Sequence, residues 1–194
     1  MAPASVLSEI RTKDPQMTVS LPSIPDFDRH SAPWVADRPR GLRVAMRSLV
    51  GGVCVITAGM GDQRTGATVT SAYSFSTDPE TMAVSINLGS SVWRAIRRHG
   101  HFCVNILNAD QKPIAERFSG FGGLKGVERY EGATWHRMAT GAPALEGALA
   151  SIDCEVEEAI ERHSHAFILG SVRAIREGEG TGLAYANGRY GHLS

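Results

Sequence analysis

The stretch from Gly66 to Pro79 is the most informative part of the chain, and it reads GATVTSAYSFSTDP. Its first half alternates small apolar residues with hydroxyl side chains, as a β-strand with one polar face does. Asp78-Pro79 then interrupts the pattern, because proline cannot donate to a strand ladder. Such a strand can present hydroxyls and backbone amides to a planar polar ligand, although hydroxyls that simply face water are the common alternative.

A second polar cluster, Asn87-Leu-Gly-Ser90-Ser91, precedes a helix predicted over residues 92–98. Serine is a favoured helix N-cap, and the amides and dipole at a helix N-terminus attract phosphate. Arg94, Arg97 and Arg98 either add positive charge there or form the solvated face of the helix. One planar ligand that carries a phosphate would account for both clusters.

The segments around these clusters predict a mainly β protein. Apolar or alternating runs favour strands over 53–57, 67–72, 81–88, 101–107, 149–158 and 165–174, and a hairpin over 183–193. Helical periodicity is expected over 40–50, 92–98 and 110–118, whereas 119–147 is expected to be irregular. The acidic end of the 149–158 strand is interpreted as a solvated sheet edge. About seven strands with three short helices favour a closed or split antiparallel barrel over a doubly wound sheet.

Composition places the chain among ordinary globular proteins. The 194 residues are 42% hydrophobic and 21% charged, and 20 Lys+Arg balance 20 Asp+Glu. This excludes a wholly disordered chain and a coiled coil, and a neutral chain is not expected to bind nucleic acid. Six of the nine prolines lie within residues 1–39, which we interpret as an N-terminal arm before one domain at 40–194.

The sequence also predicts the compartment. No apolar run is long enough to span a membrane, and residues 1–10 lack the features of a signal peptide. Cys54, Cys103 and Cys154 lie in separate apolar stretches and form no Cys-x-x-Cys motif. We therefore expect three reduced, buried thiols, no structural zinc, and a cytoplasmic protein.

Common catalytic motifs are missing from the sequence. The glycines of residues 120–126 lack the spacing, preceding strand and acidic partner of a dinucleotide-binding loop, and there is neither a phosphate-binding P-loop nor a Gly-x-Ser-x-Gly motif. Two His-x-His pairs, His99/His101 and His163/His165, would share a face if each lay on a strand. They leave a metal-dependent barrel as an alternative.

An ordered set of motifs resembles a known family. The set comprises Gly51-Gly-Val-Cys-Val-Ile-Thr57, the 66–79 stretch with Ser-x-Asp-Pro, Ser90-Ser91, Phe102-Cys-Val-Asn-Ile-Leu107, Ala115-Glu-Arg-Phe118, Trp135, Gly141-Ala-Pro143 to Ala150, Asp153-Cys154, His165 and Gly170-Ser-Val172. In this order the chain, over roughly 40–194, is similar to the short-chain flavin reductases. These are NAD(P)H:flavin oxidoreductases that supply reduced flavin to two-component monooxygenases.

The resemblance implies a split β-barrel, a homodimer, FMN or FAD as flavin, and NADH or NADPH as hydride donor. It also assigns roles to residues. The flavin ring would be lined by Thr68, Val69, Thr70 and Ser71, and Ser74, Phe75 and Ser76 would continue that wall. The ribityl chain and phosphate would be held by Asn87, Ser90 and Ser91, and Phe118 would close the pocket. His165 would lie where the nicotinamide docks, and Tyr190 would contact nucleotide.

Three positions depart from the family pattern. His163 stands where the family has glycine before its histidine, Ala72 precedes Tyr73 where the aromatic residue usually comes one position earlier, and Glu80 replaces a second proline. None of them removes a group that hydride transfer requires, since the flavin itself carries the redox chemistry. We expect His165 to position the nicotinamide rather than abstract a proton.

Two further alternatives follow from the resemblance. One is a non-catalytic barrel that holds flavin or heme and senses redox state. The other is a flavoprotein reductase that acts on a corrinoid or an iron complex. The sequence does not decide whether the flavin is a substrate or a prosthetic group.

Overall fold

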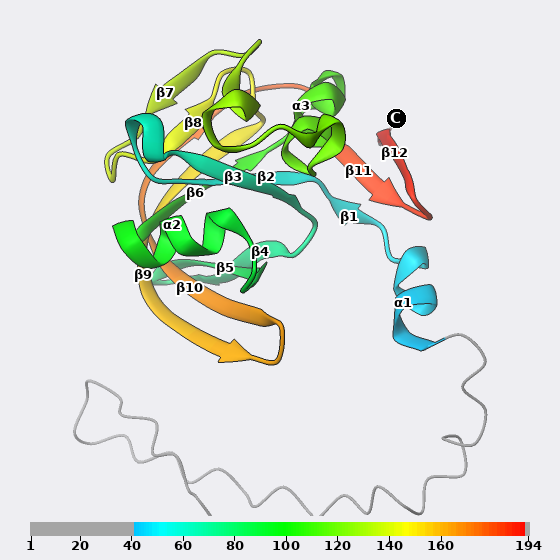
Figure 1. The fold of residues 1–194 in the computed structure, drawn as a ribbon, viewed down its shortest axis with the longest axis horizontal. Helices are drawn as coiled ribbons and strands as arrows, with labels where there is room; N and C mark the ends of the chain where they lie inside the picture. Colours follow the sequence, from blue (N-terminus) through cyan, green and yellow to red (C-terminus); the bar gives the residue numbers. More distant parts are fainter. Residues whose placement is uncertain (1–40, 193–194) are drawn as a thin grey trace, which may run out of the picture. The chain divides into compact units, whose positions relative to one another are not determined.

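The computed structural model describes residues 41–192, and its centre is one seven-stranded antiparallel sheet (Figure 1). The spatial order of its strands is β3-β2-β6-β9-β10-β5-β4. Their bounds are β2 (Cys54–Ala58), β3 (Thr65–Val69), β4 (Ala72–Thr77), β5 (Glu80–Asn87), β6 (His101–Ile106), β9 (Ala150–Arg162) and β10 (His165–Glu177). The predicted arm, residues 1–39, lies outside the described residues, so its boundary stays a prediction.

The sheet curls until its two edge strands meet. β3 and β4 are the edges, yet only residues 70–71 separate Val69 from Ala72 along the chain. At this corner the Ser85 N–H donates to the Ser71 carbonyl at 3.2 Å, and the Ser71 hydroxyl donates to the Ser85 carbonyl at 2.9 Å. These bonds tie the end of β3 to β5 and so join the two edges of the sheet at one corner. The predicted mainly β, split antiparallel barrel is confirmed.

Helix α2 (Ser91–His99) covers part of this barrel (Figure 1). Trp93 and Ile96 lie on one helical face and are buried in the main hydrophobic cluster with side chains from the strands. The Ser90 hydroxyl accepts from the Trp93 N–H at 3.2 Å, and Gly100, at a φ of 69°, ends the helix. The sequence prediction of a helix capped by serine is confirmed.

Helix α3 (Lys112–Phe118) covers a second, smaller cluster. Ala115 and Phe118 are buried there, and the Phe118 ring lies edge-on to Tyr130 with 5.1 Å between ring centroids. Gly66 on β3 makes this packing possible, because a Cβ at that position would lie 2.7 Å from the Phe118 ring.

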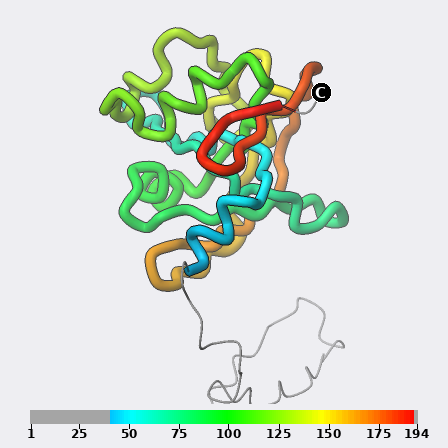
Figure 2. The backbone as a smooth tube through the Cα atoms, turned by 90° about the vertical axis from the view of Figure 1, so that its right-hand side faces the viewer, coloured from blue at the N-terminus to red at the C-terminus, as the bar shows by residue number. Residues whose placement is uncertain are grey.

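Two small sheets complete the fold. β1 (Gly51–Gly52), β11 (Leu183–Ala186) and β12 (Arg189–His192) form one, and Figure 2 shows the blue N-terminal segment beside the red hairpin. Asn187 and Gly188 both have positive φ angles, 51° and 79°, which suits a two-residue hairpin turn. β7 (Trp135–Arg137) and β8 (Pro143–Leu145) form the other.

The structure corrects two sequence predictions and confirms a third. The helix expected over 40–50 is shorter: α1 (Gly41–Ala45) passes into a 3-10 turn and buries no residue, so its apolar spacing does not reflect packing within the described chain. The acidic end of β9 is a solvated sheet edge, as predicted, because β6 pairs with β9 only as far as Glu155 and the exposed Glu157 and Glu158 have a partner strand on one side alone. The region 119–147 contains the β7–β8 hairpin, whose strands are too short to show alternation.

The helices of the described residues are short. None of those in residues 41–192 is both long and apolar enough to cross a bilayer.

Candidate functional site

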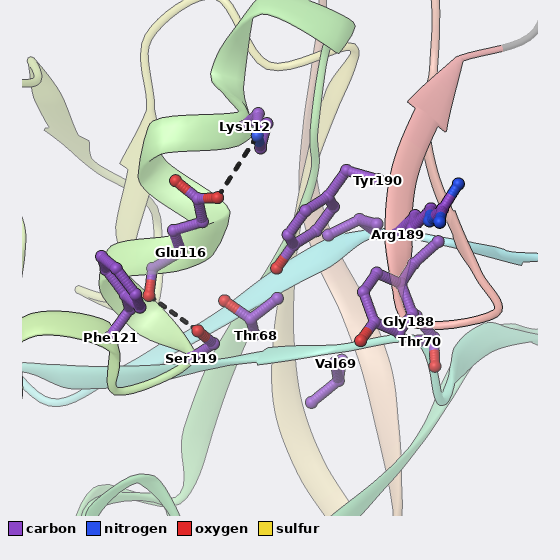
Figure 3. Close-up of a pocket in the computed structure, with 12 residues that line it drawn as sticks. Thr68, Val69, Thr70, Lys112, Glu116, Ser119, Phe121, Gly188, Arg189 and Tyr190 are labelled. Carbon is purple, nitrogen blue, oxygen red and sulfur yellow. Dashed lines mark hydrogen bonds and ion pairs between the residues drawn. The ribbon is translucent and has the colours of Figure 1, made fainter. Parts of the chain in front are cut away.

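A cavity of about 610 Å³ lies where the end of β3, helix α3 and the β11–β12 hairpin come together (Figure 3). This volume is within the range of about 300–1,000 Å³ that is usual for small-molecule sites. The lining residues are Val53, Thr68, Val69, Thr70, Lys112, Glu116, Ser119, Phe121, Tyr185, Gly188, Arg189 and Tyr190. Four of them, Thr68, Val69, Thr70 and Tyr190, are among the predicted site residues.

Strand β3 sets the inner wall of the cavity. The Thr68 hydroxyl donates to the Ala115 carbonyl at 2.6 Å and so ties β3 to α3. The last residue pair of the β2–β3 ladder is Cys54 with Val69, so the backbone of Thr70 lies beyond that ladder. Thr70 is also exposed, which leaves it accessible to a ligand at the cavity wall.

Two tyrosines form an aromatic wall on the hairpin. Tyr185 and Tyr190 pair across the β11–β12 turn, with 5.0 Å between ring centroids at an interplanar angle of 63°. Burial raises the pKa of Tyr190, and the nearby Glu116 carboxylate and Tyr185 raise it further, whereas a hydrogen bond with Ser119 opposes this. Its hydroxyl therefore stays protonated at neutral pH and can donate a hydrogen bond.

Three charged side chains also line the cavity. Lys112 and Glu116 form an ion pair one helical turn apart, with 3.4 Å between Nζ and Oε1. Arg189 forms no ion pair within residues 41–192. An aromatic wall, hydroxyl groups and an unpaired guanidinium fit a ligand that has a flat ring and an anionic tail, and flavin nucleotides belong to this class.

A second group of predicted residues meets at the N-terminus of α2. Asn87 and His165 are direct partners in the β5–β10 ladder. The Ser90 hydroxyl donates to the Asn87 carbonyl at 2.7 Å, and the Ser91 hydroxyl shares a hydrogen bond of 2.8 Å with that of Thr65. Asn87 ends β5, Ser90 caps α2 and Ser91 begins that helix, while Thr65 begins β3. They line no part of the cavity described above.

The other predicted residues lie apart from both groups. Ser71 bonds to β5 at the barrel corner. Ser74, Phe75 and Ser76 are on edge strand β4, where Ser74 and Phe75 are exposed. Phe118 is fully buried, under β3. Its position supports the wall of the cavity rather than forming its surface.

Sequence reasoning missed most of the outer wall. Lys112, Glu116, Ser119, Phe121, Tyr185, Gly188 and Arg189 were not predicted as site residues. For the hairpin a usable signal existed, because Asn187-Gly188 predicts a two-residue turn that places Tyr185 opposite Tyr190. For Phe121 and α3 no local signal existed, since only packing onto β3 brings them to the cavity.

The His-x-His pairs do not form a metal centre. His163 lies in the turn between β9 and β10 at a φ of 53°, and His99 ends α2 while His101 begins β6, so neither pair shares a strand. The His99 and His101 rings lie 5.6 Å apart, and both Nε2 atoms are buried without a partner beside a second cavity of about 490 Å³. Within residues 41–192, however, no three His, Cys, Asp or Glu side chains are grouped so as to hold a metal.

Known proteins match both the sequence and the fold. The family model described as "Flavin reductase like domain" matches residues 46–194. The chain is 36% identical over 149 residues to the FMN reductase (NADH) RutF 2 of Methylorubrum extorquens, which covers 76% of this chain and 86% of the relative.

Two solved structures extend the likeness to the fold. The flavin reductase component BorF of a bacterial two-component tryptophan halogenase has a TM-score of 0.72 at 28% identity, covering 78% of this chain and 96% of BorF. A homolog of nitrilotriacetate monooxygenase component B from Mycobacterium thermoresistibile has a TM-score of 0.71 at 28% identity, covering 78% and 84%. The family predicted from the ordered motifs is confirmed: this chain belongs to the flavin reductase like domain family.

Proposed function

We propose that this chain is an NAD(P)H-dependent flavin reductase and that its flavin binds in the cavity between β3, α3 and the β11–β12 hairpin. The observation that carries the proposal is that Thr68, Val69 and Thr70, which were predicted to line the flavin ring, meet Tyr190, a predicted nucleotide contact, in one cavity of a chain from this family. NADH is the favoured donor and FMN a fitting acceptor, because the RutF relative is named for both.

The protein's own residues position and shield the ligands. A bound flavin supplies the redox chemistry by accepting a hydride from the nicotinamide. The backbone around Thr70 and the protonated Tyr190 hydroxyl offer hydrogen bonds to a polar ring edge, and Tyr185 gives an apolar surface. Holding two reactants in one orientation accounts for a large share of such catalysis.

His165 positions the nicotinamide in this proposal. It begins β10, is exposed to solvent, and its Nδ1 lies 2.9 Å from the Ser164 hydroxyl. A ring held in this way can offer its other nitrogen to a carboxamide. Asn87, its partner in the ladder, would help to hold the ribityl chain and phosphate of the flavin, as the resemblance implies.

A homodimer and a separate oxygenase are the proposed partners. Leu42 and Leu49, in α1 and just after the 3-10 turn that follows it, are 76% and 63% exposed, and a second copy of the chain would cover this apolar surface. One structural relative is named as a homolog of a monooxygenase component and another as the flavin reductase component of a two-component halogenase, which supports delivery of reduced flavin to a separate oxygenase. All three cysteines are free and buried, which fits the reducing cytoplasm.

The decisive experiment measures the oxidation of NADH by the purified full chain with FMN, FAD or no flavin. We expect flavin-dependent loss of NADH absorbance, and slower or no loss with NADPH. Tight flavin binding without NADH oxidation would instead favour a non-catalytic barrel. NADH oxidation that requires an added corrinoid or iron complex would indicate a different acceptor.

A further inference from the structure

The second cavity, of about 490 Å³, is separate from the proposed flavin site. Its wall is formed by the end of α2, the start of β6, the loop between β7 and β8, and the neighbouring strands β9 and β10. None of its lining residues lines the cavity between β3, α3 and the β11–β12 hairpin. The proposed function therefore makes no use of it.

Two imidazole rings line this second cavity. His99 ends α2, His101 begins β6, and Gly100 turns the chain between them at a φ of 69°. The Nε2 atom of each ring is buried and has no hydrogen-bond partner within residues 41–192, and His101 is only 5% exposed. Because a buried polar nitrogen without a partner is costly, a ligand whose oxygen atoms hydrogen bond to both rings would be stabilised here.

Two guanidinium groups favour an anion over a metal ion as this ligand. Arg137 on β7 is close enough to His101 to lower the pKa of that ring, and it forms no ion pair within residues 41–192. Arg173 on β10 lines the cavity, with its Nε 2.9 Å and its Nη2 2.6 Å from Glu155 Oε2. Guanidinium groups repel a metal cation, whereas their planar donors match the oxygen atoms of an oxyanion.

The two carboxylates in this region already have partners. Glu155 lines the cavity and is neutralised by Arg173. Asp153 is fully buried and accepts two hydrogen bonds from Thr140, from the N–H at 2.7 Å and from the hydroxyl at 2.6 Å. Their negative charges are therefore largely offset within the protein.

The charge of His101 can change when a ligand binds. Burial lowers its pKa, and His99 and Arg137 lower it further, whereas Asp153 and the Gly59 carbonyl act in the opposite direction with a smaller effect. The ring is therefore neutral at neutral pH and has one donor and one acceptor nitrogen. An anion beside the ring would favour its protonated form, in which both nitrogens donate.

We propose that the second cavity binds a small oxyanion, either a carboxylate or a tetrahedral anion of the phosphate and sulfate class, together with a proton. The anion accepts hydrogen bonds from the Nε2 atoms of His99 and His101 and from the Arg173 guanidinium. The proton is taken up from solvent by the histidine pair, because an adjacent negative charge stabilises the imidazolium. Anion and proton therefore strengthen each other's binding.

The test is titration calorimetry of the flavin-free full chain with sodium sulfate and with sodium acetate as the probes. Titrations are run at a mildly acidic and a mildly alkaline pH, with sodium chloride added to hold the ionic strength constant. Neither probe changes its charge between these pH values, so the pH dependence reports on the protein. We expect binding at the acidic pH that is at least about tenfold weaker at the alkaline pH. Tighter binding of sulfate assigns the site to a tetrahedral anion, and tighter binding of acetate assigns it to a carboxylate.

Two variants move the affinity in opposite directions. His101→Gln should weaken binding at the acidic pH about tenfold and remove most of the pH dependence. Glu155→Gln should tighten binding, because it removes a negative charge and releases the guanidinium of Arg173, whereas a bound cation would respond in the opposite direction. This second variant keeps both histidines, so the test does not depend on the stability of His101→Gln. The matched control is His163→Asn at the exposed β9–β10 turn, which should leave the affinity unchanged.

Three results would overturn the proposal. They are a wild-type chain that binds neither anion, affinities that are equal at the two pH values, and affinities that His101→Gln and Glu155→Gln leave unchanged. NADH oxidation with FMN is measured on the same preparations and tests the proposed function separately, since no residue of the second cavity belongs to the flavin site.

Discussion

Asn105 shows how a single buried amide fixes several strands. It is fully buried on β6 and donates to the Val55 carbonyl at 3.0 Å and the Thr57 hydroxyl at 3.2 Å. Its Oδ1 accepts from the Leu145 N–H and the Ser151 hydroxyl, both at 2.8 Å. One side chain thus joins β2, β6, β8 and β9. This role in holding the strands together explains the Asn of the Phe-Cys-Val-Asn-Ile-Leu motif.

Replacing Asn105 with leucine should therefore cost stability rather than ligand affinity. Several buried donors and acceptors would lose their partner, which predicts a loss of about 3 kcal/mol in the free energy of unfolding. Urea unfolding measures it. Ser151→Ala, which removes one of the four bonds, should cost only about 1 kcal/mol. If both variants unfold at the wild-type urea midpoint, the hydrogen-bond network contributes nothing to the free energy of unfolding.

His165→Ala tests the role proposed for the exposed histidine. We expect kcat to fall about tenfold through the loss of one positioning hydrogen bond, with the Kd of FMN little changed. Steady-state kinetics and a flavin titration separate the two effects. His163→Asn is the matched control, because asparagine tolerates the positive φ at this turn. Parallel losses of kcat and flavin affinity would assign His165 to structure instead.

At the scale of elements, helix α2 depends on its cap. The Ser90 hydroxyl accepts from the Trp93 N–H, one of the amides that a helix leaves unpaired at its start. Ser90→Ala should reduce the free energy of unfolding by about 1 kcal/mol, and Ser90→Thr should retain most of it. Thermal or urea unfolding checks this. If this helix instead bound a phosphate, Ser90→Ala would weaken the affinity for FMN but not the affinity for riboflavin.

The junction between α2 and β6 should make stability depend on pH. Burial lowers the pKa of His101, as do the nearby His99 and Arg137, while Asp153 and the Gly59 carbonyl act in the opposite direction. The folded state therefore binds a proton less readily than the unfolded state. As the pH falls below the ordinary histidine pKa of about 6.5, the unfolded chain takes up the proton first, and stability decreases.

The corresponding variant is His101→Gln. Its free energy of unfolding should fall less than that of wild type between neutral pH and mildly acidic pH. Urea unfolding at the two pH values measures the difference, with His163→Asn, an exposed histidine, as control. A decrease of equal size in wild type and His101→Gln would show that other groups govern the acid sensitivity.

At the scale of the whole molecule, the exposed apolar residues of 41–50 indicate that a partner surface covers them. The proposed homodimer predicts that Leu42→Lys with Leu49→Lys converts a dimer into a monomer of 20.8 kDa, because two charges cannot be buried unpaired. Light scattering after size exclusion measures the mass. Met60→Lys, at another exposed apolar position, should remain dimeric. A wild-type monomer at micromolar concentration would contradict the proposal.

The sequence alone indicated most strands of the main sheet, the capped helix and the family. The mostly apolar runs over 81–88 and 101–107 are local properties of the chain, and so are the Ser90 cap and the hydroxyl-rich stretch at 66–79. These patterns predicted a split antiparallel barrel, and the resemblance to a family assigned four residues of the cavity. The ordered motifs identified the flavin reductases, since they record which side chains this family keeps in sequence order.

Only the tertiary structure decided which segments share a site. Alternation tells which face of a strand is polar, but it does not tell which strand or helix lies beside it. Lys112 and Arg189 stand 77 positions apart in the numbering, yet they line one cavity because α3 packs on β3 and the hairpin pairs with β1. The same packing buried Phe118, since the elements that pack against a residue, and not its neighbours along the chain, set what its side chain meets.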